Sequence, residues 1–137
     1  MPWRGSFLAP HISIMIHFDP SSNPPSTLVA RFYRATSGRE PVRDWLKSLP
    51  QEERRQIGAD IRTVQLGWPI GMPLVGHLDG QIWEVRTQLA HRIARVLFAQ
   101  VGGEMILLHG FIKKDRKTPK PDLDLARNRL KKLRSAS

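Results

Sequence analysis

The order of hydrophobic and polar positions predicts a folded domain that begins at residue 27. Residues 28–34 are rich in β-branched, aromatic and aliphatic side chains, which favours a first strand. Apolar residues at helical spacing then predict two amphipathic helices. The first begins near Pro41, and the second begins at Pro50 and ends at Gly67.

The second half of the chain predicts a loop, three strands and a last helix. Residues 70–80 contain several glycines and prolines and are expected to form the loop. The strands follow at short spacing, over residues 82–87, 92–99 and 104–112. A final helix from Asp122 would bury Leu123, Ala126, Leu130 and Leu133. The order is β-α-α-β-β-β-α, which predicts an α+β domain with its helices packed on one side of an antiparallel sheet.

Residues 1–26 are expected to be a poorly ordered N-terminal extension of the domain over 27–137. A run of Pro, Ser and Asn between Pro20 and Ser26 resists both helix and strand. The alternation from Ile12 to Phe18 would suit a short strand, and a translation start at Met15 is equally compatible with the sequence. We assign this extension no function.

Charge and composition narrow the functional classes. The chain has 137 residues, 22 Lys and Arg against 12 Asp and Glu, and a formal net charge of +10. Ten basic and three acidic residues lie from Phe111 onward, giving this segment a charge of +7. Such clustering favours a polyanion or an acidic partner, although a solvated basic helix would give the same pattern. No apolar stretch is long enough to span a bilayer and no signal peptide is evident, so a cytoplasmic protein without a membrane partner is expected.

Several kinds of chemistry are absent from the sequence. The chain has no cysteine, which excludes disulfides, thiol catalysis, iron–sulfur clusters and cysteine-based zinc sites. The histidines show no HExxH arrangement, and there is no P-loop, GxGxxG fingerprint or GxSxG elbow. We therefore expect neither a metal nor a cofactor.

Polar residues within the apolar strands are the candidates for function. Alternation places Glu84 and Arg86 on one face of their strand and Arg95 opposite Val96 and Phe98. In the last strand, the residues of one parity are Met105, Leu107, His109, Phe111 and Lys113. If the strand registers match, one concave face collects Glu84, Arg86, Arg95, His109 and Lys113.

Each candidate also has a purely structural interpretation. Glu84 and Arg86 would suit cross-strand ion pairs on a solvated face, and Arg95 an ordinary exposed strand position. His109 would suit a half-buried histidine whose hydrogen bonds are satisfied. The segment from Lys113 to Lys117 would suit a solvated loop.

Four segments carry a family resemblance: Arg39–Leu46, Ile82–Arg86, Arg95–Phe98 and Leu107–Lys114. They resemble the RelE/ParE toxin superfamily and, more narrowly, its HigB-like, phage-derived branch. Thr118-Pro119, followed by a helix with Ala126 and Arg129, fits that branch as well. The resemblance covers roughly residues 28–133.

The resemblance implies a RelE-like fold and a toxin of a type II toxin–antitoxin system. Many such toxins cleave mRNA without a metal, usually in the ribosomal A site, whereas ParE-like members poison DNA gyrase. The implied partners are mRNA, the ribosome and a cognate antitoxin that often carries a helix-turn-helix domain, with higher toxin–antitoxin assemblies as a further expectation. An inactive basic module that binds nucleic acid or a partner is the remaining alternative.

If the protein is a ribonuclease, the 2′-hydroxyl of the RNA is the nucleophile. Arg86 and Arg95 are expected to hold the scissile phosphate, and Lys113 to stabilise its charge. Glu84 or His109 is the candidate base, with a preference for His109. The expected RNA-binding residues are Lys114, Arg116, Lys117 and Lys120.

Overall fold

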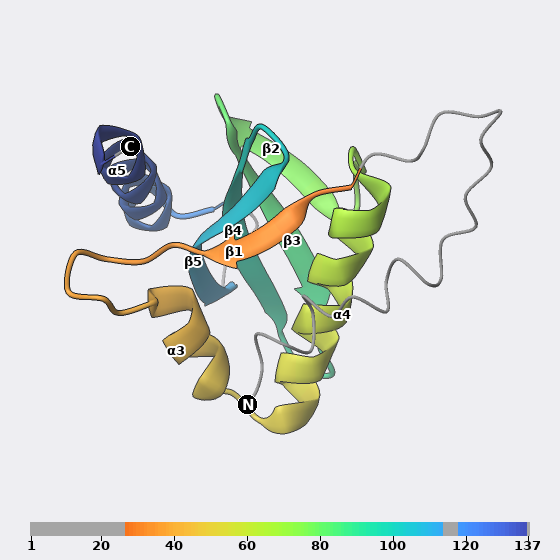
Figure 1. Cartoon of the computed structure of the whole chain (residues 1–137). Helices are drawn as coiled ribbons and strands as arrows, with labels where there is room; N and C mark the ends of the chain where they lie inside the picture. The colour runs from red at the N-terminus through yellow and green to blue at the C-terminus, as the bar shows by residue number, and fades with distance from the viewer. Residues whose placement is uncertain (1–26, 114–117, 137) are drawn as a thin grey trace, which may run out of the picture.

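A five-stranded sheet forms the centre of the protein in this computed structural model, which describes residues 27–113 and 118–136 (Figure 1). The elements are, in chain order, β1 (Val29–Phe32), α3 (Pro41–Lys47), α4 (Gln51–Gly67), β2 (Val75–Asp79), β3 (Ile82–Gln88), β4 (Ile93–Val101), β5 (Glu104–Lys113) and α5 (Lys120–Ala136). The predicted extension over residues 1–26 lies outside the described residues. Within the described part of the chain, none of the helices is long and apolar enough to cross a membrane.

The sheet is mixed, with the strand order β1-β5-β4-β3-β2. The predicted antiparallel meander of β3, β4 and β5 is confirmed. The expectation of an entirely antiparallel sheet is wrong, because β1 pairs with β5 in parallel, with Val29 opposite Glu104. Three further strands and two helices separate β1 from β5 in the chain, so no hairpin constrains the direction of this pair.

The expected loop over residues 70–80 was wrong in part, because it contains β2. Residues Val75 to Asp79 pair antiparallel with β3, and Gly76 lies opposite Glu84. A Cβ atom at Gly76 would lie 2.8 Å from Nη2 of Arg86. The absence of a side chain at Gly76 therefore leaves space for the guanidinium group of Arg86. Glycine is uncommon inside strands, which is why Gly76 contributed to the prediction of a loop.

Helices cover both faces of the sheet, which corrects the expectation that they pack on one side (Figure 1). The α3 and α4 helices cover one face, with a core that includes Phe32, Leu46, Ile57, Ile61, Val85 and Phe98. The α5 helix covers the other face, with a core that includes Tyr33, Ile82, Leu97, Ile106, Leu108, Ala126 and Leu130. The central strand β4 is buried on both sides, which explains its continuous run of apolar residues.

A bulge in β5 shifts the alternation of its side chains by one residue, so that odd-numbered residues face one side of the sheet before the bulge and the other side after it. Phe98 pairs with Leu107 and Leu97 with His109, so the register omits Leu108. The predicted parity of β5 is therefore wrong: Met105 and Leu107 belong to the core under α3 and α4, whereas His109 and Phe111 face α5. The main-chain oxygen of Leu108 accepts a hydrogen bond of 2.7 Å from Nη1 of Arg129.

We predict that Gly110→Ala destabilises the protein, because a Cβ atom there would overlap the indole ring of Trp45. Overpacking of this kind should lower the free energy of unfolding by about 1–3 kcal/mol. Urea denaturation measures the change, and Gly103→Ala is the matched control, since its Cβ atom would meet nothing within 4 Å. Equal denaturation midpoints for the two variants would contradict the prediction.

Candidate active site

Two rows of side chains cross the three central strands on the face covered by α5. One row is Glu84, Leu97 and His109, and the next is Arg86, Arg95 and Phe111. Alternation places Lys113, opposite Ile93, in the row after that. The predicted convergence of Glu84, Arg86, Arg95, His109 and Lys113 on one face is therefore observed. It depends on the β5 bulge, because without that bulge His109 would pair with Val96 and face the opposite core.

The carboxylate of Glu84 is the centre of a buried polar network. Its side chain is 0% exposed, and Nη1 of Arg95 lies 2.8 Å from both of its oxygens. Nε of Arg86 donates a third hydrogen bond, at 2.8 Å. The hydroxyl of Thr118 donates a fourth, also at 2.8 Å, and accepts one from Nη1 of Arg95. Glu84 is thus enclosed by side chains from β3, β4 and the residue that lies two positions before α5.

The two arginines of this network differ in exposure. Arg95 is 3% exposed, and this burial lowers the pKa of its guanidinium from the ordinary value, while Glu84 opposes the decrease. Arg86 is 28% exposed, and its Nη1 also contacts Sδ of Met72 at 3.1 Å. Arg86 is therefore the arginine of the pair that presents surface to solvent.

His109 and Asp122 form the second polar pair of this face. Nε2 of His109 lies 2.6 Å from Oδ1 of Asp122, in the first turn of α5, and the two side chains are 15% and 25% exposed. An ionised carboxylate only accepts hydrogen bonds, so Nε2 is the donor when Asp122 is ionised, and Nδ1 is the second nitrogen of the ring. The imidazole also stacks on Phe111, with the ring centroids 5.4 Å apart.

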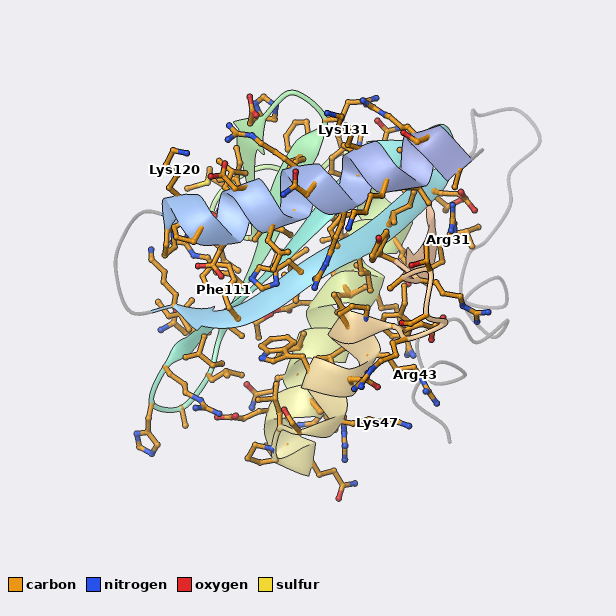
Figure 2. The ribbon with its side chains drawn as sticks, turned by 90° about the vertical axis from the view of Figure 1, so that its left-hand side faces the viewer. Arg31, Arg43, Lys47, Phe111, Lys120 and Lys131 are labelled. Carbon is orange, nitrogen blue, oxygen red and sulfur yellow. The ribbon has the colours of Figure 1, made fainter. Side chains whose placement is uncertain are left out.

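The remaining predicted cations lie near the end of β5 and the beginning of α5. Figure 2 shows Phe111 on β5 and Lys120 in the first turn of α5, where Lys120 is exposed and pairs with Asp124 at 2.9 Å. Arg43 and Lys47 lie on α3, across the sheet from that helix. The predicted RNA-binding residues Lys114, Arg116 and Lys117 lie outside the described residues.

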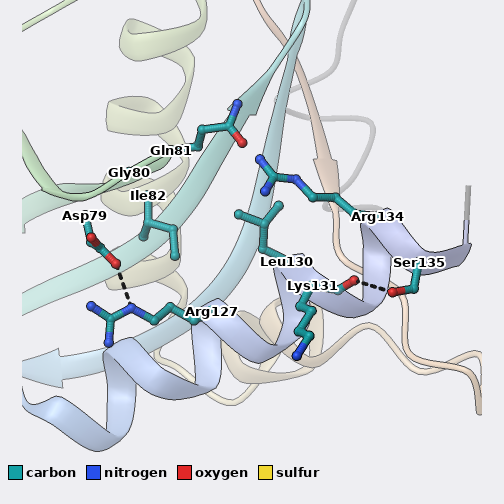
Figure 3. A pocket seen from close by; sticks show the side chains of 9 residues that line it. All are labelled: Asp79, Gly80, Gln81, Ile82, Arg127, Leu130, Lys131, Arg134 and Ser135. Atoms are coloured by element: carbon teal, nitrogen blue, oxygen red, sulfur yellow. Dashed lines mark hydrogen bonds and ion pairs between the residues drawn. The ribbon is translucent and has the colours of Figure 1, made fainter.

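A separate open pocket of about 490 Å³ lies between the β2–β3 turn and the second half of α5 (Figure 3). Arg127 points across it to Asp79, with 2.7 Å between Nε and Oδ2, and also contacts Asp124 at 2.9 Å. Two carboxylates thus compensate the charge of Arg127, while Lys131 and Arg134 also line the pocket.

The chain matches the family described as "Phage derived protein Gp49-like (DUF891)" over residues 44–131, which is more than half of its length. The chain belongs to this family. Gp49-like proteins are a family of RelE-like toxins, and the mixed five-stranded sheet with three helices in the described residues is consistent with a RelE-like fold. Among curated proteins, no sequence matches the chain.

Three residues of this candidate site were not identified from the sequence: Gly76, Thr118 and Asp122. Thr118 was noted only as half of a Thr-Pro pair, and Asp122 only as the expected beginning of a helix. Their roles depend on where α5 and β2 pack, which local pattern does not determine. Only Gly76 carried a signal, since a glycine next to apolar strand residues often marks a close approach of another group.

We predict that Glu84→Gln lowers the free energy of unfolding of this Gp49-like protein by about 3 kcal/mol. The substitution keeps the size of the side chain but removes the carboxylate charge that lies beside the buried Arg95. Urea denaturation is the measurement. Glu52→Gln is the control: Glu52 forms an exposed pair with Arg55, so no measurable change is expected there. Wild-type stability in Glu84→Gln would show that the carboxylate charge is not needed.

Proposed function

We propose that this protein is the toxin of a type II toxin–antitoxin system and that it cleaves mRNA through attack of the 2′-hydroxyl, without a metal. One observation carries the proposal: a partly exposed arginine and a histidine–aspartate pair share a single sheet face. Membership of a RelE-like toxin family supports it.

The proposed reaction requires a base, a proton donor and stabilisation of negative charge. A base removes the proton of the 2′-hydroxyl, the 2′-oxygen attacks phosphorus, and the bond from phosphorus to the 5′-oxygen breaks. The products are a 2′,3′-cyclic phosphate and a 5′-hydroxyl, whose oxygen takes up a proton. The protein must also stabilise the negative charge that accumulates on the phosphate oxygens.

His109 is the group best placed for the proton transfers. Asp122 fixes its ring through Nε2 and leaves Nδ1 to accept or return a proton. Glu84 was the alternative base, but its carboxylate already accepts hydrogen bonds from three side chains and has no exposed surface. We therefore assign the acid–base role to His109 and a positioning role to Glu84.

Arg86 is the proposed ligand of the scissile phosphate. Its side chain is partly exposed, and a guanidinium group matches the geometry of phosphate oxygens. Arg86 on β3 and His109 on β5 are two strand spacings and one row of side chains apart, which corresponds to about 12 Å between their backbones. Lys113 and Lys120 would bind flanking phosphates. Arg95 is buried against Glu84 and would support Arg86 instead of contacting RNA.

The proposed partners follow from this surface and from the family. The proposed substrate is mRNA, presented by the ribosome in the cytoplasm. A cognate antitoxin, for which a helix-turn-helix protein is the expected type, would cover the same positively charged face. The HigB-like branch is the narrower assignment that we propose within the RelE-like toxins.

We predict that induced expression of the protein creates new mRNA ends inside translated frames, each with a 5′-hydroxyl. Arg86→Ala should reduce their number at least tenfold, which corresponds to about 1.4 kcal/mol of transition-state stabilisation. His109→Ala should reduce it roughly a hundredfold, the lower range for loss of a general acid or base. Mapping of RNA 5′ ends by their chemistry provides the measurement.

Arg55→Ala is the matched control, because this exposed arginine lies on α4, behind the opposite face of the sheet, and pairs with Glu52. It should cleave as the wild type does. New ends that carry 5′-phosphates would contradict 2′-hydroxyl attack. Growth arrest with intact mRNA and damaged DNA would instead favour the ParE-like inhibition of gyrase, and the absence of any growth arrest would favour an inactive binding module.

A further inference from the structure

Thr118 makes contacts that the proposed chemistry does not require. It lies two residues before α5, yet its hydroxyl contacts Glu84 of β3 and Arg95 of β4, each at 2.8 Å. Its Oγ1 donates to the carboxylate and accepts from the guanidinium at the same time, so one hydroxyl group serves both partners. Thr118 thus connects the beginning of the last helix to the centre of the polar network.

The first consequence concerns the orientation of Arg86. Glu84 binds Arg95 through both oxygens and Arg86 through Oε2 alone, while Thr118 binds Oε1. The hydroxyl therefore opposes rotation of the carboxylate about its last bond. Because Nε of Arg86 is held by that carboxylate, the direction of its guanidinium depends on the angle that Thr118 sets.

The second consequence concerns His109. Asp122, its hydrogen-bond partner, lies four residues after Thr118 in the first turn of α5. Pro119 restricts the backbone of Thr118 to extended conformations, so the anchor and the first turn are joined by a short, stiff connection. Contacts of Thr118 on β3 and β4 and of Asp122 on β5 together fix the beginning of the helix over three strands.

We infer that Thr118 is a positioning residue for the cleavage reaction: through Glu84 it orients Arg86, and through the first turn of α5 it places Asp122 against His109. This inference rests on the proposed function. The residue contacts neither the RNA nor the reacting atoms, and its contribution is the alignment of the two halves of the site.

The experiment compares Thr118→Val, Thr118→Ser and the wild type. Valine keeps the shape and removes the hydroxyl, whereas serine keeps the hydroxyl. Cleavage of ribosome-bound mRNA should show kcat about tenfold lower for Thr118→Val with KM changed less than twofold, and serine should restore most of the rate. Thr63→Val is the control, because the hydroxyl of this exposed threonine on α4 donates to the main chain of Ala59, one turn earlier in the same helix.

Hydrogen exchange followed by mass spectrometry provides a measurement that does not depend on cleavage. Amides in the first two turns of α5 should exchange faster in Thr118→Val than in the wild type, and at the wild-type rate in Thr118→Ser. An unchanged exchange rate in Thr118→Val would contradict the inference that Thr118 anchors the beginning of α5.

Two further outcomes separate this inference from the proposed function. Faster exchange with wild-type kcat would show an anchor that only stabilises the helix, and would overturn the positioning role. A wild-type protein that leaves RNA intact would overturn the proposed function and the catalytic part of the inference, while the exchange rates would still decide whether the anchor exists.

Discussion

The carboxylate of Glu84 has no exposed surface, and several neighbouring residues compensate its buried charge. A buried charge is tolerated only when counter-charges and hydrogen bonds replace its water. Arg95 and Arg86 supply the charge, and Thr118 supplies a further donor. The absence of a side chain at Gly76 leaves space for the second guanidinium. Side chains of β3, β4 and the residue two positions before α5 are thus held together by a single carboxylate.

The bulge at Leu108 shifts the alternation of β5 by one residue. The first half of β5 gives Met105 and Leu107 to the core under α3 and α4, and the second half turns His109 and Phe111 toward α5. The carbonyl group of Leu108 is bound by Arg129, so the helix that covers the site also stabilises the irregularity that forms it. The site and the last helix therefore depend on each other.

Local pattern predicted the strands and helices well wherever one periodicity dominated. Alternation in β3 and β4 was sufficient to place Glu84, Arg86 and Arg95 on a common face. Alternation gave the wrong face for half of β5, because the extra residue of a bulge exchanges the two faces and no residue type in this strand indicates a bulge. Local pattern also missed β2, because Gly76 is there to leave space for the side chain of Arg86. It could not predict the contacts of Thr118 and Asp122, because these form only when segments distant in the sequence pack together.

The parallel pairing of β1 with β5 has a consequence for synthesis of the chain. The first strand of the described residues has no partner in the sheet until the last strand has been made, while β2 to β5 can pair as each follows the previous one. The α5 helix, which covers Glu84 and holds His109, leaves the ribosome later still. A chain interrupted before residue 118 would lack Thr118, Asp122 and Arg129 together, so the complete arrangement exists only in protein whose translation has passed α5.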